Sequence, residues 1–361
     1  MNWANFQETN YRLTEKDIAE LNKQILSQYR DAMKDIDAQL KDVHSEILSG
    51  VKPEDYYKVM IKHDRIEKLK ASVAESYTTY SKRAQVLTEH AISISASNTF
   101  YRSVFAQSWI SEMVPKAVIP YDLIELITYG TESAWKEIPA QRRAKYEALY
   151  GKLADLQAKA GTLTEFLVSN RKYEIEQIQR VIAQGLKTGK SYSSMASMVK
   201  DIIGSVVSQD GTMTAKGAMA AAMNIVSSES GRAMNAASYA STQYLASTGE
   251  DVEKSWLATL DGRTRDTHKH LDGKRLPVDG LFKAYYKGQL YTALYPGGFG
   301  CPALDNRCRC TTIDIIGGQG PALRTGRNPV TGKNEVFDYK DFEQWAKDNE
   351  LKTNVYGELY K

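Results

Sequence analysis

The stretch "TEKDIAELNKQILSQYRDAMKDIDAQLKDVHSEIL" at residues 14–48 decides the fold class of the first part of this chain. Its apolar side chains recur in steps of three and four, at Ile18, Leu21, Ile25, Tyr29, Ala32, Ile36, Leu40, Val43 and Ile47. Those steps place one apolar stripe along a helix. The "SGVKP" at 49–53 predicts the end of this helix, and Pro53 suits the first turn of a second one. The pair predicts a long antiparallel helical hairpin over residues 1–95.

Helical patterns continue through the middle of the chain. Segments that favour helix lie at 99–114, 131–158, 162–187 and 190–207. The stretch 213–247 is dense in Ala, Ser, Gly and Met, and small side chains let helix backbones approach closely. We expect one or two tightly packed helices there, ended by Gly249. These segments together predict a helical domain over residues 96–250.

The sequence pattern changes after Val252, where β-prone words alternate with glycine-rich turns. The words are "KSWLATL", "GQLYTALY" and "CTTIDII", and the turns include "LDGK" and "YPGGFG". They predict a small irregular α+β module over residues 251–333. A tail over 334–361 contains a short amphipathic helix at 339–351. The predicted fold class is therefore a mainly α N-terminal region of long helices followed by a small α+β C-terminal module.

Composition narrows the classes of function. The chain has 361 residues, 42% of them hydrophobic and 25% charged, and a net charge of +3. That charge is too small to make the whole chain a nucleic-acid-binding protein. No apolar run approaches the roughly 20 residues of a membrane helix, and the first residues lack a signal pattern. Residues 262–333 carry 12 Lys and Arg against 5 Asp and Glu, so positive charge is concentrated in the module.

All three cysteines of the chain lie in "CPALDNRCRC" at 301–310, and His268 and His270 lie upstream in "DGRTRDTHKHLDG". Three thiolates and one imidazole suit one tetrahedral zinc ion. With four protein ligands the site would be structural, because catalysis needs an open position. The alternative is that Cys308 and Cys310 share one face of a strand and pack as small apolar groups, with Cys301 incidental.

A polar word precedes the cysteines. Within nineteen residues it places Asp261, Arg263, Arg265, Asp266, His268, Asp272 and Asp279. One interpretation is a His/Asp acid–base pair, or carboxylates that hold a divalent cation for phosphodiester cleavage. The interpretation that we favour is a loop-rich scaffold, in which Asp-Gly pairs form turns and Arg and Asp pair across them.

Several words in a fixed order resemble the head morphogenesis, or minor head, protein family of tailed bacteriophages, typified by the F protein of phage Mu. They are "SSESGRAMNAA", "SWLATLDGRTRDTHKHLDG", "YPGG", "NRCRC" and the ending "RTGRNPVTGKNEVFDYKDFEQW", over about residues 225–350. The motif residues are Glu229, Arg232, Asn235, Trp256, Asp261, Arg263, Arg265, Asp272, Gly273, Pro296, Gly297, Asn306 and Arg309. Arg307 departs from the family pattern by splitting the usual Asn-Cys pair. Many members carry Cys at the position of His268 and His at that of Cys301, an exchange that zinc ligands tolerate. The resemblance thus nominates His268, Cys301, Cys308 and Cys310 as the ligands.

The resemblance implies a structural role. Members are low-copy proteins inside the phage head near the portal, and they reach the procapsid from the host cytoplasm. The portal protein is the implied partner, with the major capsid or scaffolding protein and phage DNA, bound without sequence specificity, as further candidates. Residues that could contact the portal or nucleic acid are Arg263, Lys274, Arg275, Arg324 and Arg327.

We therefore expect a non-catalytic protein of head assembly and of DNA packaging, retention or ejection. The alternative is a metal-dependent nuclease or a toxin-like effector delivered with the phage DNA. In this family toxin domains are C-terminal fusions, and the chain ends ten residues after "EQWAKDNEL", which argues against one. A zinc-dependent DNA-binding protein is a third reading, but no recognition-helix pattern supports it.

Overall fold

The structure is a computed structural model, and it contains two compact units, each described here by itself. It describes residues 3–62, 64–110, 161–204, 206–209, 212–215, 217–320, 322–329, 331–353 and 359–360. The helical unit consists of Ile18–Ala91 and Lys159–Val226. The C-terminal unit contains Ser227–Lys361, grouped with Met1–Asp17 and Ile92–Ala158. The helix predicted at 131–158 lies outside the described residues.

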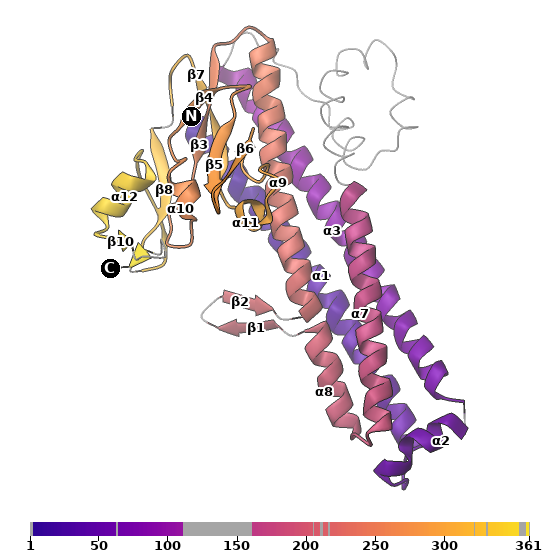
Figure 1. Ribbon diagram of the computed structural model, residues 1–361. Helices are drawn as coiled ribbons and strands as arrows, with labels where there is room; N and C mark the ends of the chain where they lie inside the picture. Colours follow the sequence, from indigo (N-terminus) through magenta and orange to yellow (C-terminus); the bar gives the residue numbers. More distant parts are fainter. Residues whose placement is uncertain are drawn as a thin grey trace, which may run out of the picture. The chain divides into compact units, whose positions relative to one another are not determined.

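Long helices build the helical unit around one shared apolar core (Figure 1). The helices of the first part of the chain are α1 (Trp3–Glu46), the 3-10 turn η1 (Pro53–Asp55), α2 (Tyr56–Lys62), α3 (Ile66–Ile110), α7 (Gly161–Lys187), α8 (Tyr192–Ile203) and α9 (Gly217–Ser247). The stripe predicted on α1 is buried at Ile25, Ala32, Ile36 and Leu40. The fold class predicted from the sequence is confirmed.

Two local predictions in this unit were wrong. The second helix does not run unbroken from Pro53, because Asp64 has a left-handed φ of 49° and the chain turns between α2 and α3. The helices predicted at 190–207 and 213–247 lose their adjoining ends to an antiparallel hairpin of β1 (Val206–Gln209) and β2 (Thr212–Ala215). The signal was present, because the β-branched pair Val206-Val207 is followed by an Asp-Gly word typical of hairpin turns.

A three-stranded antiparallel sheet is the centre of the C-terminal unit. Strand β3 (Val252–Leu257) lies between β4 (Arg275–Pro277) and β7 (Thr311–Ile316). Two hairpins flank it in sequence, β5 (Phe282–Tyr286) with β6 (Gln289–Ala293), and β8 (Leu323–Arg327) with β9 (Asn334–Asp338). The remaining elements are α10 (Asp266–Lys269), α11 (Pro302–Asp305), α12 (Phe342–Asp348), β10 (Lys352–Thr353) and β11 (Leu359–Tyr360). The β-prone words predicted from the sequence are therefore strands.

One apolar core includes side chains from Trp256 to Leu351 of the C-terminal unit. Trp256, Phe282 and Phe299 pack in the same cluster as Phe342 and Trp345 of α12. Strand β9 pairs along its whole length with β8. The predicted boundary at residue 333, which places β8 in the module and β9 in the tail, therefore cuts through a hairpin. The structure makes the short helix of the tail part of the module.

Lys254 is an unusual residue in the central strand, because its side chain is buried among aromatic rings. Only 1% of it is exposed, and its Nζ lies 4.7 Å from the centre of the Tyr239 ring. The Nζ donates a hydrogen bond of 2.9 Å to the carbonyl oxygen of Leu294. Burial lowers the pKa of Lys254 to about 8 from the usual 10.5.

We expect this shift to appear in the pH dependence of stability. Between about pH 8 and 10.5 the unfolded chain still binds the Lys254 proton, whereas the folded chain has released it. The free energy of unfolding should therefore rise with pH relative to a Lys254→Met variant, by up to about 3 kcal/mol. Urea unfolding of both proteins at several pH values measures the difference. Lys283→Met removes an exposed lysine of β5 and should show no such trend. A constant difference between wild type and Lys254→Met would contradict the prediction.

Candidate functional site

Three of the four predicted metal ligands meet in the C-terminal unit. His268 lies on α10, and Cys308 and Cys310 lie just before β7. The His268 Nδ1 is 3.5 Å from the Sγ atom of each cysteine, and the three ligand atoms lie within 4.8 Å of one another. The three side chains are 1%, 7% and 3% exposed. The arrangement is a closed cluster of two thiols and one imidazole.

Aromatic rings form the wall of this cluster. The Trp256 ring meets the His268 ring edge-on, with centroids 5.4 Å apart and an interplanar angle of 76°. Phe299 packs against the same imidazole at 6.0 Å. Trp256 is 0% exposed, so the imidazole lies against an apolar surface that excludes solvent. Its Nε2 atom has no hydrogen-bond partner in the structure.

The other two predicted candidates lie apart from the cluster. Cys301 is buried at the N-cap of α11 and lies outside the group of three ligand atoms. His270 is exposed, and its Nδ1 lies 2.7 Å from the carbonyl oxygen of Asp266. Of the two histidines, the structure thus places the one nominated by the resemblance beside the thiols. It does not place Cys301 there.

The pKa values of the two thiols in the cluster are shifted in opposite directions. A hydrogen bond from Cys310 holds the pKa of Cys308 well below its usual range against the opposing effect of burial, and His268 adds to this. The same hydrogen bond and burial raise the pKa of Cys310. The two opposite shifts make Cys308 the more acidic thiol of the pair.

Helix α9 holds the cysteine loop from one side. Asn235 donates a hydrogen bond of 2.9 Å from Nδ2 to the carbonyl oxygen of Cys310, and the Ser228 hydroxyl accepts the N–H of Arg307 at 2.9 Å. Between them Gly231 leaves room for the loop, because a Cβ there would lie 3.3 Å from the Cys308 carbonyl oxygen. The three helix residues are spaced by three and four, which places them on one face of α9.

The remaining α9 motif residues contact the Pro-Gly turn. Glu229 and Arg232 form an ion pair one turn apart. Gly297 has a φ of 83°, which favours glycine, and a Cβ at this position would lie in van der Waals contact with Arg232, 3.4 Å from its Cα. Its neighbour Pro296 is buried. The "YPGG" word therefore packs against the helix that holds the cysteine loop.

Asp261 links the polar segment around His268 to the cysteine segment at 301–310. Its carboxylate forms a bidentate ion pair with Arg309, which lies between the two cluster cysteines. Burial opposes ionisation of Asp261, but the hydrogen bonds and charge of Arg309, together with the N–H and charge of Arg263, lower the pKa of the carboxyl group overall. Arg265 makes a second link, because its guanidinium donates to the carbonyl oxygen of Asn306. Arg263 also contacts Asp261, but its side chain is 67% exposed.

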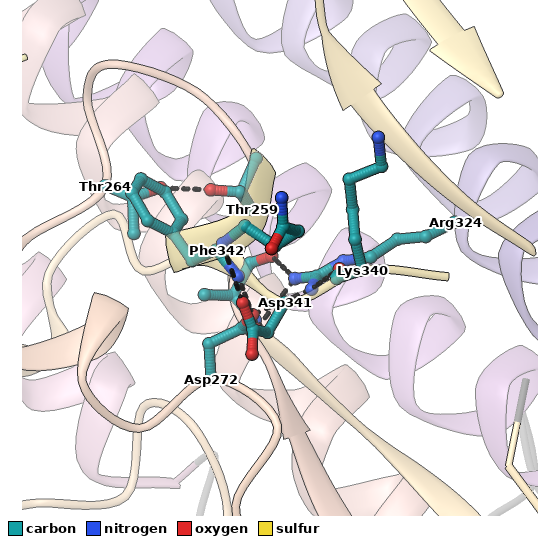
Figure 2. Close-up of polar contacts among 9 residues, drawn as sticks. Thr259, Thr264, Asp272, Arg324, Lys340, Asp341 and Phe342 are labelled. Carbon is teal, nitrogen blue, oxygen red and sulfur yellow. Dashed lines mark hydrogen bonds and ion pairs between the residues drawn. The ribbon is translucent and has the colours of Figure 1, made fainter. Parts of the chain in front are cut away.

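Asp272 forms a second, fully buried ion pair with Arg324 of β8 (Figure 2). Each carboxylate oxygen lies 2.7 Å from a guanidinium nitrogen, and the two side chains are 1% and 2% exposed. The carboxylate also accepts the backbone N–H groups of Ala258 and Phe342, each at 2.6 Å. Arg324 donates to the carbonyl oxygens of Ala258 and Lys340. Its predicted role as a surface contact must be corrected, because its guanidinium is buried and fully occupied.

Comparison with known proteins places this site in a family. Residues 176–313 match the family described as Phage Mu protein F like protein. This matched stretch is the phage Mu protein F-like segment of the chain. Minor head protein GP7 of Bacillus phage SPP1 is 32% identical over 186 residues, which are 52% of this chain and 55% of GP7. The NAD(+)--arginine ADP-ribosyltransferase EFV of Enterococcus faecalis (strain ATCC 700802 / V583) is 32% identical over 180 residues, 49% of this chain and 33% of that protein.

The predicted resemblance to phage minor head proteins is confirmed by these matches. The chain spans about half the length of GP7 and about a third of the transferase. No solved structure matches it significantly. The phage Mu protein F-like segment begins within α7 and ends within β7, and so contains the whole Cys/His cluster. Arg324, the partner of Asp272, lies beyond the matched segment.

Four of the five residues predicted to contact the portal or nucleic acid are exposed. Arg263, Lys274 and Arg275 are exposed, as is Arg327 just beyond the segment. Trp256 and Gly273 are structural, because the N–H of Gly273 donates to the Trp256 carbonyl oxygen at 2.9 Å and Gly273 has a φ of 72°. Among the described residues, no helix is both long and apolar enough to cross a membrane.

Proposed function

We propose that the protein is a minor head protein that associates with the portal inside the phage head. There it would act in head assembly and in DNA packaging, retention or ejection, without catalysis. Two findings support the proposal, the phage Mu protein F-like segment and the similarity to a protein named minor head protein. Portal association and the location inside the head are extended from the resemblance to this chain.

The observation that carries the non-catalytic role is the state of the two central carboxylates. Asp261 and Asp272 are the acids that a hydrolase interpretation would use. Both are buried, and each is neutralised by an arginine, Arg309 or Arg324. A carboxylate whose oxygens are already bound to guanidinium and backbone N–H groups is poorly placed to bind a cation or a substrate. Their chemistry is that of a scaffold.

The contact surface that we propose is the set of exposed cations Arg263, Lys274, Arg275 and Arg327. Exposed positive charge would favour an acidic face of a portal subunit and would speed encounter with it. The module carries the excess of positive charge in the chain, which supports the choice of this surface. Phage DNA, with its phosphates, is the competing occupant.

The similarity to the ADP-ribosyltransferase supports a shared segment and no more. The similar stretch covers a third of the transferase. The transferase activity is stated in the name of that protein, and we do not extend it to this chain. An enzymatic role would require a hydrolytic or transferase activity of the purified chain that survives when head association is lost.

The test is incorporation into heads. An epitope-tagged chain would be produced during growth of the phage that encodes it, and heads would be purified on a density gradient. The chain should sediment with heads, resist external protease and cross-link to the portal protein. A variant with Arg263, Lys274, Arg275 and Arg327 changed to Glu should enter heads at least ten-fold less while remaining folded.

Lys283→Glu with Lys287→Glu is the matched control, because both lysines are exposed on the β5–β6 hairpin of the same unit. This control should enter heads normally. Absence of the wild-type chain from purified heads would refute the proposal. Normal incorporation of the four-residue variant would refute the basic contact surface, and cross-linking to DNA in place of the portal would transfer that surface to DNA.

A further inference from the structure

We propose that His268, Cys308 and Cys310 bind one zinc ion as three protein ligands and that Cys301 is not a ligand. The proposal concerns the stability of the C-terminal unit and stands independently of the function proposed above. It differs from the four-ligand set expected from the sequence. Zinc would serve as a structural link between α10 and the start of β7, forty residues apart at His268 and Cys308.

The first argument is distance. Zn–S bonds are about 2.3 Å and Zn–N bonds about 2.0–2.1 Å, so a tetrahedral ion separates its sulfur and nitrogen ligands by about 3.6 Å. The observed distance from His268 Nδ1 to each of the two Sγ atoms is 3.5 Å. A single Nδ1–H cannot point at both sulfurs at once, whereas one ion between the three atoms contacts all of them.

The second argument is preorganisation. The His268 ring is fixed between Trp256 and Phe299, so its Nδ1 faces the thiols without the loss of a free rotamer. Two hydrogen bonds hold the backbone of the cysteine loop separately. Asn235 donates to the carbonyl oxygen of Cys310, and the Thr259 hydroxyl donates to the carbonyl oxygen of Arg309 at 2.8 Å. Ligand atoms positioned in advance favour metal binding, because little ordering is left to occur on binding.

The third argument is donor chemistry. Two sulfurs and one imidazole nitrogen form a soft and borderline set, which suits zinc and does not suit magnesium or calcium. The three donors are buried and lie within 4.8 Å of one another, so a single ion could bind all of them away from solvent. Within the part of the chain that the structure describes, this is the group of His, Cys and acidic residues close enough to hold an ion.

The structure also gives a reason to exclude Cys301. Its backbone N–H donates a hydrogen bond of 3.0 Å to the Asp305 carboxylate, and its carbonyl oxygen accepts the N–H groups of Leu304 and Asp305 at 2.9 Å each. These contacts hold Cys301 at the α11 N-terminus and outside the three-residue group. A small non-protein ligand would complete the coordination of the ion, and the site would still be structural because its three donors are at most 7% exposed and so closed to a substrate.

The experiment uses the full-length chain, purified and dialysed against zinc under reducing conditions. Elemental analysis should give one zinc per chain for wild type and for Cys301→Ser, the matched control. Cys308→Ser and Cys310→Ser should bind at least ten-fold more weakly in competition with a chelator. Cobalt(II) loading should give thiolate charge-transfer absorption in wild type and Cys301→Ser, and less of it in the two ligand variants.

His268→Cys serves as a control for misfolding, because it keeps a zinc donor at the same place and should retain the ion. Far-ultraviolet circular dichroism of each variant would confirm the helical content. Chelator should lower the melting temperature of wild type and leave that of Cys308→Ser unchanged. Two results would overturn the proposal: a wild-type chain that binds no zinc, or a Cys308–Cys310 disulfide that persists under reducing conditions. Loss of zinc from Cys301→Ser equal to that from Cys308→Ser would overturn the three-ligand set.

Discussion

Replacing Arg324 with methionine is expected to lower the free energy of unfolding of the C-terminal unit by about 3–5 kcal/mol. The substitution would leave the Asp272 carboxylate 1% exposed without its counter-charge. It would also leave the carbonyl oxygens of Ala258 and Lys340 without the donors that they now have. A buried charge without a partner costs far more than the pair contributes when intact, so the single change should be severe.

The measurement is urea unfolding together with hydrogen–deuterium exchange of peptides from β8 and α12. Exchange should accelerate in both elements, because Asp272 links them through Arg324 and the N–H of Phe342. Arg327→Met is the control on the same strand, where the side chain is exposed, and should change stability by less than about 0.5 kcal/mol. The double change Asp272→Leu with Arg324→Met should recover only the part of the loss that comes from the buried charge, because the N–H groups of Ala258 and Phe342 then lose their acceptor. Equal effects of Arg324→Met and Arg327→Met would contradict the role assigned to the ion pair.

Trp256→Ala is expected to cost about 3–5 kcal/mol, the range for large-to-small changes of buried aromatic residues. Trp256 is 0% exposed on the central strand β3, and its ring centroid lies 5.0 Å from that of Phe282 and 5.9 Å from that of Phe299. Removal of the indole would leave a cavity between the sheet and the β5–β6 hairpin, which a short strand cannot close by relaxation.

Thermal and urea unfolding of the purified chain would measure this loss. Tyr285→Ala provides the comparison, because this aromatic residue of the neighbouring strand β5 is 65% exposed. It should change stability by less than about 0.5 kcal/mol. A Trp256→Ala protein as stable as Tyr285→Ala would show that the aromatic cluster does not form in solution.

The helices were predictable from the sequence because their signal is local. The stripe from Ile25 to Leu40 follows the helical period, and the same residues form the core. The turn at Asp64 and the β1–β2 hairpin were missed because a single left-handed residue and a four-residue strand leave little periodicity. Such short elements depend on turn chemistry, which the helical pattern around them obscured.

The candidate site was predictable in part for a similar reason. The Cys-x-Cys spacing and the upstream histidine pointed to three residues that the structure does bring together. Whether Cys301 joined them depended on how α11 begins, and residue types alone do not determine that. The pairing of Asp272 with Arg324 joins residues 52 positions apart, and no spacing rule links them. The resemblance included Arg324 only as the first residue of its last motif and did not indicate that Asp272 is its partner.

The burial of Lys254 has a consequence for chemical labelling. A pKa of about 8 would make its amine more nucleophilic at neutral pH than an ordinary lysine, if reagents could reach it. With 1% of the side chain exposed, acylating reagents and amine-directed cross-linkers reach exposed residues such as Lys283 first. Modification of Lys254 would then require the sheet to separate from the rings of Tyr239 and Phe282. This lysine is therefore a built-in reporter of transient opening of the sheet, and mass spectrometry of a labelling time course could read it.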